Sequence, residues 1–191
     1  YTVILYTMND GDLKRILNSS YQKNKKAEKT LLKSGYKLDK NLSGERAKVF
    51  VDDNNQASIV YRGTANKSDV MTDLAIPFNA LGQTKRLKHT KKIAQKVKDK
   101  YGGEVNAFGH SLGGILAERS GVDGNIITYN KASRGSNKGT RNKKQIDVRT
   151  TGDLVSILTP HHNRKKIINS GTINPLDAHG MKHLGNKNIR F

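Results

Sequence analysis

The sequence predicts an α/β fold with a mostly parallel central sheet flanked by helices. Between residues 84 and 129 a helical pattern, a short apolar strand, a glycine-rich turn, a second helix and another strand follow one another. This alternation is typical of βαβ units in a parallel sheet. The chain has 191 residues and no cysteine, and at this length it can bury a core without disulfides. We therefore expect one compact domain spanning residues 1–191.

The N-terminal third predicts helices followed by a β-hairpin. Apolar residues between Asp12 and Leu32 have helical spacing around a lysine-rich run, which indicates one or two helices. Residues 46–52 and 56–61 alternate like strands, and the turn sequence Asp53-Asn54-Asn55 joins them. The apolar opening, residues 1–8, has the length of a strand. It is too short to span a membrane and lacks the basic start of a signal peptide.

The central and C-terminal parts predict the remaining elements of the sheet. Residues 84–101 form an amphipathic helix that ends at Gly102-Gly103, and the strand 104–108 follows. A helix over 112–120 and strands over 125–129 and 145–150 come next, before a tail that contains histidines.

A glycine-rich pentapeptide between strand and helix marks the candidate nucleophile. Gly109-His110-Ser111-Leu112-Gly113 fits the Gly-x-Ser-x-Gly pattern of a nucleophile elbow, and Gly114 extends it. A serine on such a sharp turn needs neighbours without side chains, because a Cβ would clash with the adjoining strand. The predicted strand before it and the predicted helix after it favour Ser111 as a nucleophile over an idle serine in a loop.

A serine nucleophile needs a base and a carboxylate that orients the base, in the chain order Ser, acid, His for this type of elbow. Asp153 is the preferred acid because it follows the strand 145–150, and strand ends carry such groups. Among its rivals, Glu118 is on the helix after the nucleophile, Asp123 is in a turn and Asp147 is within a strand. The alternative for Asp153 is a turn residue that hydrogen-bonds its own backbone.

The preferred base is His179, because a loop near the C-terminus can bring it back to the nucleophile. His183 follows at helical spacing and remains the alternative base. His161 and His162 start a basic run that is typical of a solvated loop. A metal site on His179 and His183 lacks a third ligand, so we expect no metal. His110 adjoins the serine, so its side chain points elsewhere.

The oxyanion hole of such an enzyme needs two backbone N–H donors. One comes from the residue after the nucleophile, which is Leu112. The segment Tyr61-Arg-Gly-Thr64, at the end of an earlier strand, is the candidate for the other.

Four motifs and a late histidine together resemble the class 3 (fungal-type) lipase family of the α/β hydrolases. The motifs are Val60-Tyr-Arg-Gly-Thr64, Asp69-Val-Met-Thr-Asp-Leu74, Gly109-His-Ser-Leu-Gly-Gly114 and Gly152-Asp153. The similarity runs from about residue 47 to residue 183, and the first and third motifs in this order are its most specific part.

The resemblance implies a compact α/β-hydrolase fold and a role for each candidate. Ser111 would be the nucleophile, Asp153 the acid and His179 the base, with Thr64 and Leu112 as oxyanion donors and no cofactor. Residues 65–73 would occupy the position of a lid.

Two positions depart from the family pattern. Val70 stands where the family commonly has Trp, which concerns the lid, and Leu154 stands where it has Pro after the acid. The chain is also short for the family, so we expect at most a reduced lid and a partly open site.

The charge of the chain points to an anionic partner. Lys and Arg number 35 against 16 Asp and Glu, which gives a net charge of +19. Residues 131–144 hold only basic charged side chains; a solvated loop is the simpler interpretation, and contact with an anionic membrane is the alternative. Nucleic acid could use the same charge, but only 6% of residues are aromatic and no recognition motif is present.

The sequence therefore predicts a carboxylic ester hydrolase that acts on lipids through an acyl-enzyme, with peripheral contact to anionic membranes. The alternative is a basic module on an inactive hydrolase scaffold, which binds nucleic acid or anionic membranes. Position 1 is not Met, so we expect a piece of a longer chain or a processed product. Relatives of this kind are secreted or are modules of larger proteins, including viral ones, which leaves the compartment open.

Overall fold

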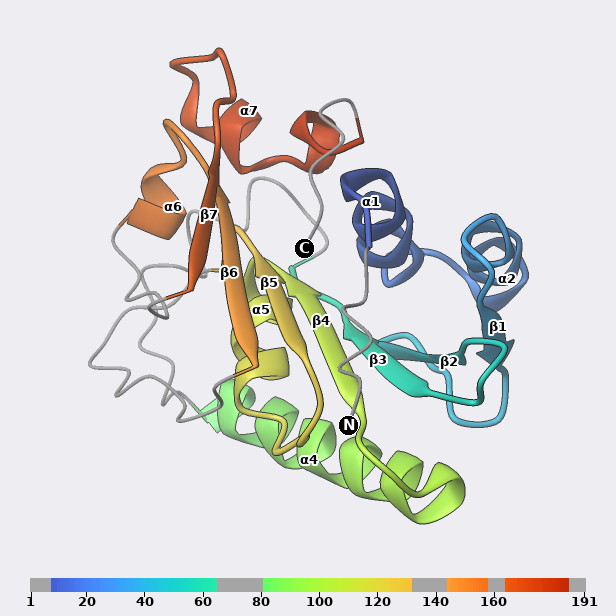
Figure 1. Ribbon diagram of the computed structural model, residues 1–191. Helices are drawn as coiled ribbons and strands as arrows, with labels where there is room; N and C mark the ends of the chain where they lie inside the picture. The colour runs from blue at the N-terminus through green and yellow to red at the C-terminus, as the bar shows by residue number, and fades with distance from the viewer. Residues whose placement is uncertain (1–7, 65–80, 132–143, 158–163, 186–191) are drawn as a thin grey trace.

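The computed structural model describes residues 8–64, 81–131, 144–157 and 164–185. These residues form one seven-stranded sheet in which the strands lie side by side in chain order (Figure 1). The strands are β1 (Lys37–Asp39), β2 (Ala47–Val51), β3 (Ala57–Tyr61), β4 (Asn106–His110), β5 (Ile126–Tyr129), β6 (Gln145–Thr150) and β7 (Lys165–Ile168).

The sheet is mostly parallel, as predicted. β1 to β3 pair antiparallel, and β3 to β7 pair parallel. In the parallel part the C-terminal ends of the strands share one edge, where α/β sheets carry their sites. Tyr61, His110, Tyr129 and Thr150 mark this edge, and the candidate residues follow these strand ends.

Two helices cover one face of the sheet. Helix α1 (Asp10–Ser19) begins at Asn9, whose side chain accepts a hydrogen bond from the Asp12 N–H, and α2 (Asn24–Leu32) follows it. Leu13, Ile16 and Leu17 of α1 are fully buried against apolar side chains of the sheet. The interval from Asp12 to Leu32 thus contains two helices.

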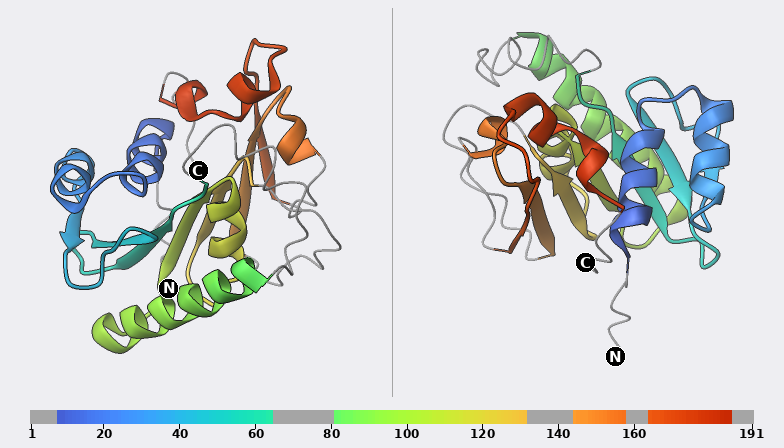
Figure 2. Two further views of the ribbon diagram at one scale, coloured as in Figure 1. Left: turned by 180° about the vertical axis from the view of Figure 1, so that it is seen from behind. Right: turned by 90° about the horizontal axis from the view of Figure 1, so that it is seen from above.

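The opposite face is covered by α4 (Leu81–Tyr101) and α5 (Leu112–Glu118), so the described residues form three layers (Figure 2). Gly102, with φ 65°, ends α4 as predicted. Although α4 has 21 residues, no described helix has the length and apolarity needed to cross a membrane.

Three short helical segments follow the last strands. They are α6 (Leu154–Ile157), α7 (Pro175–His179) and the 3-10 helix η1 (Met181–His183). Asn174 caps α7, because its side-chain oxygen accepts from the backbone N–H of Leu176 at 3.0 Å. This cap fixes the turn that carries His179.

The predicted hairpin and the strand 145–150 are confirmed, but other boundaries differ. Strand β4 begins at Asn106 and continues through Gly109 and His110, two residues later than predicted. Strand β1 was not predicted, and the run after His162 contains strand β7 rather than only a loop. Lys165 and Lys166 made this segment look like a loop, although lysines are also common on edge strands such as β7. Residues 1–7, part of the expected opening strand, lie outside the described residues.

Candidate active site

Ser111 sits on a strained turn between β4 and α5. Its backbone has φ 57° and ψ −129°, a conformation that residues other than glycine rarely adopt. Such a conformation costs about 1–3 kcal/mol and persists only where the surroundings enforce it. Two hydrogen bonds hold this turn, from the Ser111 N–H to the Tyr129 carbonyl at 3.1 Å and from the Gly114 N–H to the Ser111 carbonyl at 2.9 Å.

The glycines of the motif are required by close backbone contacts. A Cβ on Gly109 would lie 2.0 Å from the Gly113 carbonyl oxygen, and a Cβ on Gly113 would lie 2.2 Å from the Tyr61 carbonyl oxygen. Both distances are far inside van der Waals contact. The expected reason for the Gly-x-Ser-x-Gly spacing therefore holds in this chain.

Asp153 and His179 form a buried pair at the same edge of the sheet. The His179 Nδ1 lies 3.0 Å and 3.1 Å from the two carboxylate oxygens of Asp153. Asp153 is fully buried, and its Oδ1 also accepts from the Val155 N–H at 3.1 Å. The pairing assigns the proton to Nδ1 and leaves Nε2 as an acceptor. Nε2 is buried and has no hydrogen-bond partner among the described residues.

The turn that carries His179 is held by side chains from the ends of β5 and β6. Asn130 Nδ2 donates to the backbone carbonyls of Ala178 at 3.1 Å and His179 at 3.0 Å. Thr150 Oγ1 donates to the Ala178 carbonyl, and its N–H donates to Asn130 Oδ1 at 2.9 Å. Sequence reasoning missed Asn130 and Thr150, because only the fold brings these strand ends to the tail.

His110 links the nucleophile strand to the base. Its Nε2–H donates to the His179 carbonyl at 3.0 Å, and its Nδ1 accepts from the Tyr21 hydroxyl at 3.0 Å. Burial, reinforced by His179, lowers the pKa of His110 to about 3, so the ring is neutral. As expected, the His110 side chain is not part of the serine turn, but its buried position between Tyr21 and His179 was not predicted.

Tyr21 connects these hydrogen bonds of His110 to the expected oxyanion loop. The Gly63 N–H donates to the Tyr21 hydroxyl, and burial raises the pKa of Tyr21 to about 12, which keeps it protonated. A Cβ on Gly63 would lie 2.6 Å from both the Tyr21 hydroxyl and the His110 carbonyl oxygen. The loop before Thr64 thus packs directly against the serine turn.

The structure places the other predicted residues as follows. Leu112 begins α5, and Thr64 is half-buried at the end of its loop, while residues 65–73 of the expected lid lie outside the described residues. The His183 Nε2–H donates to the Asp177 carbonyl at 2.9 Å, and His183 does not pair with Asp153. The structure holds no hydrogen bond between the Ser111 hydroxyl and His179 Nε2. In unliganded enzymes this contact is often long and tightens with substrate.

The rival carboxylates have other partners. Lys131 Nζ lies 2.6 Å from Glu118 and 2.7 Å from Asp147, and all three side chains are buried. Asp123 pairs with Lys98 at 2.5 Å on the surface. Lys131 is therefore not part of a solvated loop, which corrects the expectation for residues 131–144. Residues 132–143 lie outside the described residues, as do His161 and His162.

The described residues contain no group of three or more His, Asp or Glu side chains that could hold a metal ion. The arrangement offers a hydroxyl on a strained turn, an imidazole held by a carboxylate, and backbone N–H groups at the start of α5. Such groups are suited to nucleophilic acyl transfer.

Comparison with known proteins identifies a family and structural similarity to a lipase. Residues 11–159 match the family model described as Phospholipase-like: Tle-like phospholipase domain. No curated protein matches the chain. The structure is similar to that of Lip2 lipase from Yarrowia lipolytica, with a TM-score of 0.57 and 15% identity over 92% of this chain and 81% of that one. At this identity the likeness shows a lipase-type α/β-hydrolase fold.

Proposed function

The chain belongs to the family of Tle-like phospholipase domains, and from this premise we propose that it hydrolyses carboxylic esters of lipids through an acyl-enzyme on Ser111. The observation that carries the proposal is the buried Asp153–His179 pair at the sheet edge that also holds the Ser111 turn. The motifs that resemble class 3 lipases support the same assignment.

The first half of the reaction uses the proposed triad. The Ser111 hydroxyl attacks the ester carbonyl carbon and gives its proton to His179 Nε2, and Asp153 stabilises the resulting imidazolium. The N–H of Leu112 and the N–H or hydroxyl of Thr64 donate to the oxyanion of the tetrahedral intermediate. When the intermediate collapses, His179 protonates the leaving alcohol and the acyl group remains on Ser111.

The second half returns the enzyme to its starting state. His179 takes a proton from water, which attacks the acyl carbonyl and releases the fatty acid. His179 then returns the proton to Ser111. The hydrogen bonds of Asn130 and His110 to the His179 backbone support this exchange, because they fix the base while its ring gains and loses a proton.

The net charge of +19 supports phospholipid membranes as the site of action. Each Lys or Arg near an anionic bilayer contributes about 1 kcal/mol to binding. We therefore propose peripheral contact with anionic membranes, in addition to a lipid ester substrate.

The test is hydrolysis by the 191-residue chain of a soluble short-chain ester and of anionic phospholipid vesicles. Ser111→Ala and His179→Ala are each expected to lower turnover by about five to six orders of magnitude, because triad members act as a unit. Ser120→Ala is the control. The Ser120 hydroxyl donates to the Ala117 carbonyl at the end of α5, and turnover of this variant should stay near wild type. Undiminished turnover by a folded Ser111→Ala protein would refute the proposal.

A further variant tests the choice of base. His183→Ala should change turnover little. If His183→Ala abolishes turnover and His179→Ala does not, the base is misassigned. Tight duplex DNA binding without hydrolysis of any ester would favour the basic module on an inactive scaffold.

A further inference from the structure

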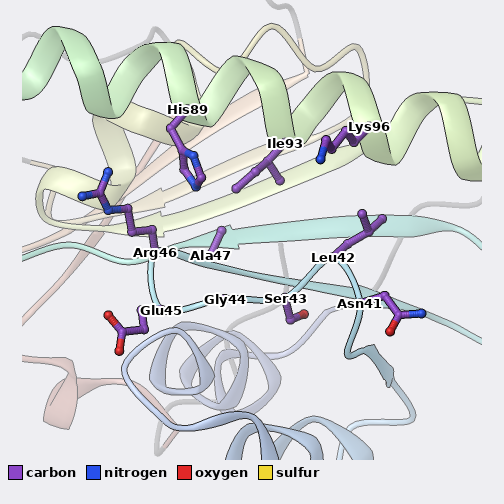
Figure 3. A pocket seen from close by; sticks show the side chains of 10 residues that line it. All are labelled: Asn41, Leu42, Ser43, Gly44, Glu45, Arg46, Ala47, His89, Ile93 and Lys96. Atoms are coloured by element: carbon purple, nitrogen blue, oxygen red, sulfur yellow. The ribbon is translucent and has the colours of Figure 1, made fainter.

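A groove of about 380 Å³ lies between the segment that leads into β2 and the middle of α4 (Figure 3). Its apolar part is formed by Leu42, Ala47 and Ile93. The side chain of Arg46, which directly precedes β2, lies beside His89 of α4. Lys96 lines the groove from the same helix, about two turns after His89.

The charges around this groove are not compensated. Burial and the cations Arg46, Lys92 and Lys96 lower the pKa of His89. In the described parts of the chain, no carboxylate forms an ion pair with these three cations. The one acidic residue of the lining, Glu45, points its carboxylate away from α4 in Figure 3.

A second groove along the same helix shows the contrast. It has a volume of about 260 Å³, and Lys91, Lys98 and Asp123 are among its lining residues. Lys98 pairs with Asp123 at 2.5 Å, and this contact lowers the pKa of Asp123. An anion would have to compete with Asp123 there, whereas the groove at Arg46 presents cations without such a competitor.

Hydrogen bonds link one end of the groove at Arg46 to the expected oxyanion loop. The Arg46 carbonyl accepts from the Arg62 N–H at 2.9 Å, and Arg62 precedes Thr64 by two residues. Arg86 of α4 donates to the Arg62 carbonyl at 2.9 Å, which ties the helix to the same loop. A molecule bound in the groove would therefore lie beside the oxyanion loop, at the edge of the sheet that carries Ser111.

We propose that this groove binds a phosphate group through Arg46, His89 and Lys96, and that its ligand is the phosphate of a phospholipid head group. Guanidinium and ammonium groups are the ordinary donors to phosphate oxygens, and an imidazole N–H also donates to them. Leu42, Ala47 and Ile93 provide contact for the carbon atoms next to a phosphoester. The choice of a lipid over free phosphate rests on the proposed function, but phosphate binding does not.

The first experiment measures phosphate binding alone. Inorganic phosphate is titrated into the Ser111→Ala protein at constant ionic strength, and the ring protons of His89 are followed by NMR. Saturable shifts and a rise in the pKa of His89 are expected, because a bound anion offsets the neighbouring cations. In Arg46→Gln/Lys96→Gln the apparent affinity should fall about tenfold or more. The matched control is Lys88→Gln/Lys91→Gln, which removes two exposed cations of α4 outside the groove and should bind phosphate as before.

The second experiment identifies the source of the phosphate. Binding is measured by cosedimentation with phosphatidylcholine vesicles that contain phosphatidic acid. The groove variant should lose about 30-fold in affinity, at about 1 kcal/mol per removed cation, and the control variant should lose much less. Equal losses in the two variants, or a selective loss of duplex DNA binding, would overturn the lipid assignment.

The outcomes separate this proposal from the hydrolytic one. If phosphate leaves His89 unchanged, the groove is not a phosphate site, whatever the esterase activity. If both binding results hold but the wild-type protein hydrolyses no ester, the proposed function fails and the phosphate site stands.

Discussion

Tyr21→Phe tests whether the hydrogen-bond chain behind the candidate site contributes to its activity. The Tyr21 hydroxyl accepts from the Gly63 N–H and donates to His110 Nδ1 at 3.0 Å, and His110 in turn donates to the His179 carbonyl. The substitution removes one oxygen atom and keeps the ring. It therefore disconnects the oxyanion loop from the strand that carries Ser111 without opening a large cavity.

The magnitude follows from the two groups that lose their partner. The Gly63 N–H and His110 Nδ1 are both left without the hydroxyl, and each buried polar group left unsatisfied costs about 1–3 kcal/mol. For two such groups we expect the free energy of unfolding to fall by about 2–6 kcal/mol. A misplacement of about 1 Å in a catalytic group can cost about 100-fold in rate. We expect kcat to fall between 10-fold and 100-fold, with KM nearly unchanged.

The assay is hydrolysis of a soluble ester together with urea unfolding, and Tyr101→Phe is the matched control. The Tyr101 hydroxyl donates to Asp39 at 2.8 Å at the far end of α4. Its loss should cost about 1 kcal/mol of stability and leave kcat unchanged. A wild-type kcat for folded Tyr21→Phe, or equal kcat losses in both variants, would refute a positioning role for Tyr21.

Two further predictions concern stability. The pKa of His110 is about 3 in the folded protein against 6.5 in the unfolded chain, so the unfolded chain binds more protons between these values and stability falls as the pH drops. From pH 7 to pH 5 His110 should cost about 2 kcal/mol, and urea unfolding of His110→Gln should show a pH dependence smaller by this amount; an unchanged dependence would contradict the buried neutral ring. Lys131→Met leaves Glu118 and Asp147 buried without their cation and should cost about 3–5 kcal/mol, whereas Lys98→Met at an exposed pair should cost at most about 1 kcal/mol. Equal unfolding midpoints for these two variants would exclude a buried ionic network.

The parts of the site that depend on local geometry could be predicted from the sequence. The turn at Ser111 is determined within a few residues, because Gly109 and Gly113 are needed wherever a strand turns sharply into a helix. Asp153 was preferred for its position after a strand and His179 for its position near the C-terminus, and the fold brings these two together.

The supporting contacts could not be predicted, because they join segments far apart in the chain. Tyr21 lies 89 residues from His110, and Asn130 lies 49 residues from His179. Neither residue is part of a recognisable motif, since another hydrogen-bonding side chain at the same place in the fold could make the same contacts. Strand β7 was missed for another reason: its two lysines are typical of a loop, and only its pairing with β6 identifies it as a strand.

The central claim is that Ser111 is a nucleophile activated by His179 and Asp153. The most direct measurement is covalent trapping of the 191-residue protein with a fluorophosphonate, followed by intact mass and peptide mapping. We expect one adduct per chain, located on Ser111, absent in Ser111→Ala and formed far more slowly in His179→Ala. No adduct on a folded wild-type protein, or an adduct on a different serine in a protein that hydrolyses lipid esters, would contradict the claim.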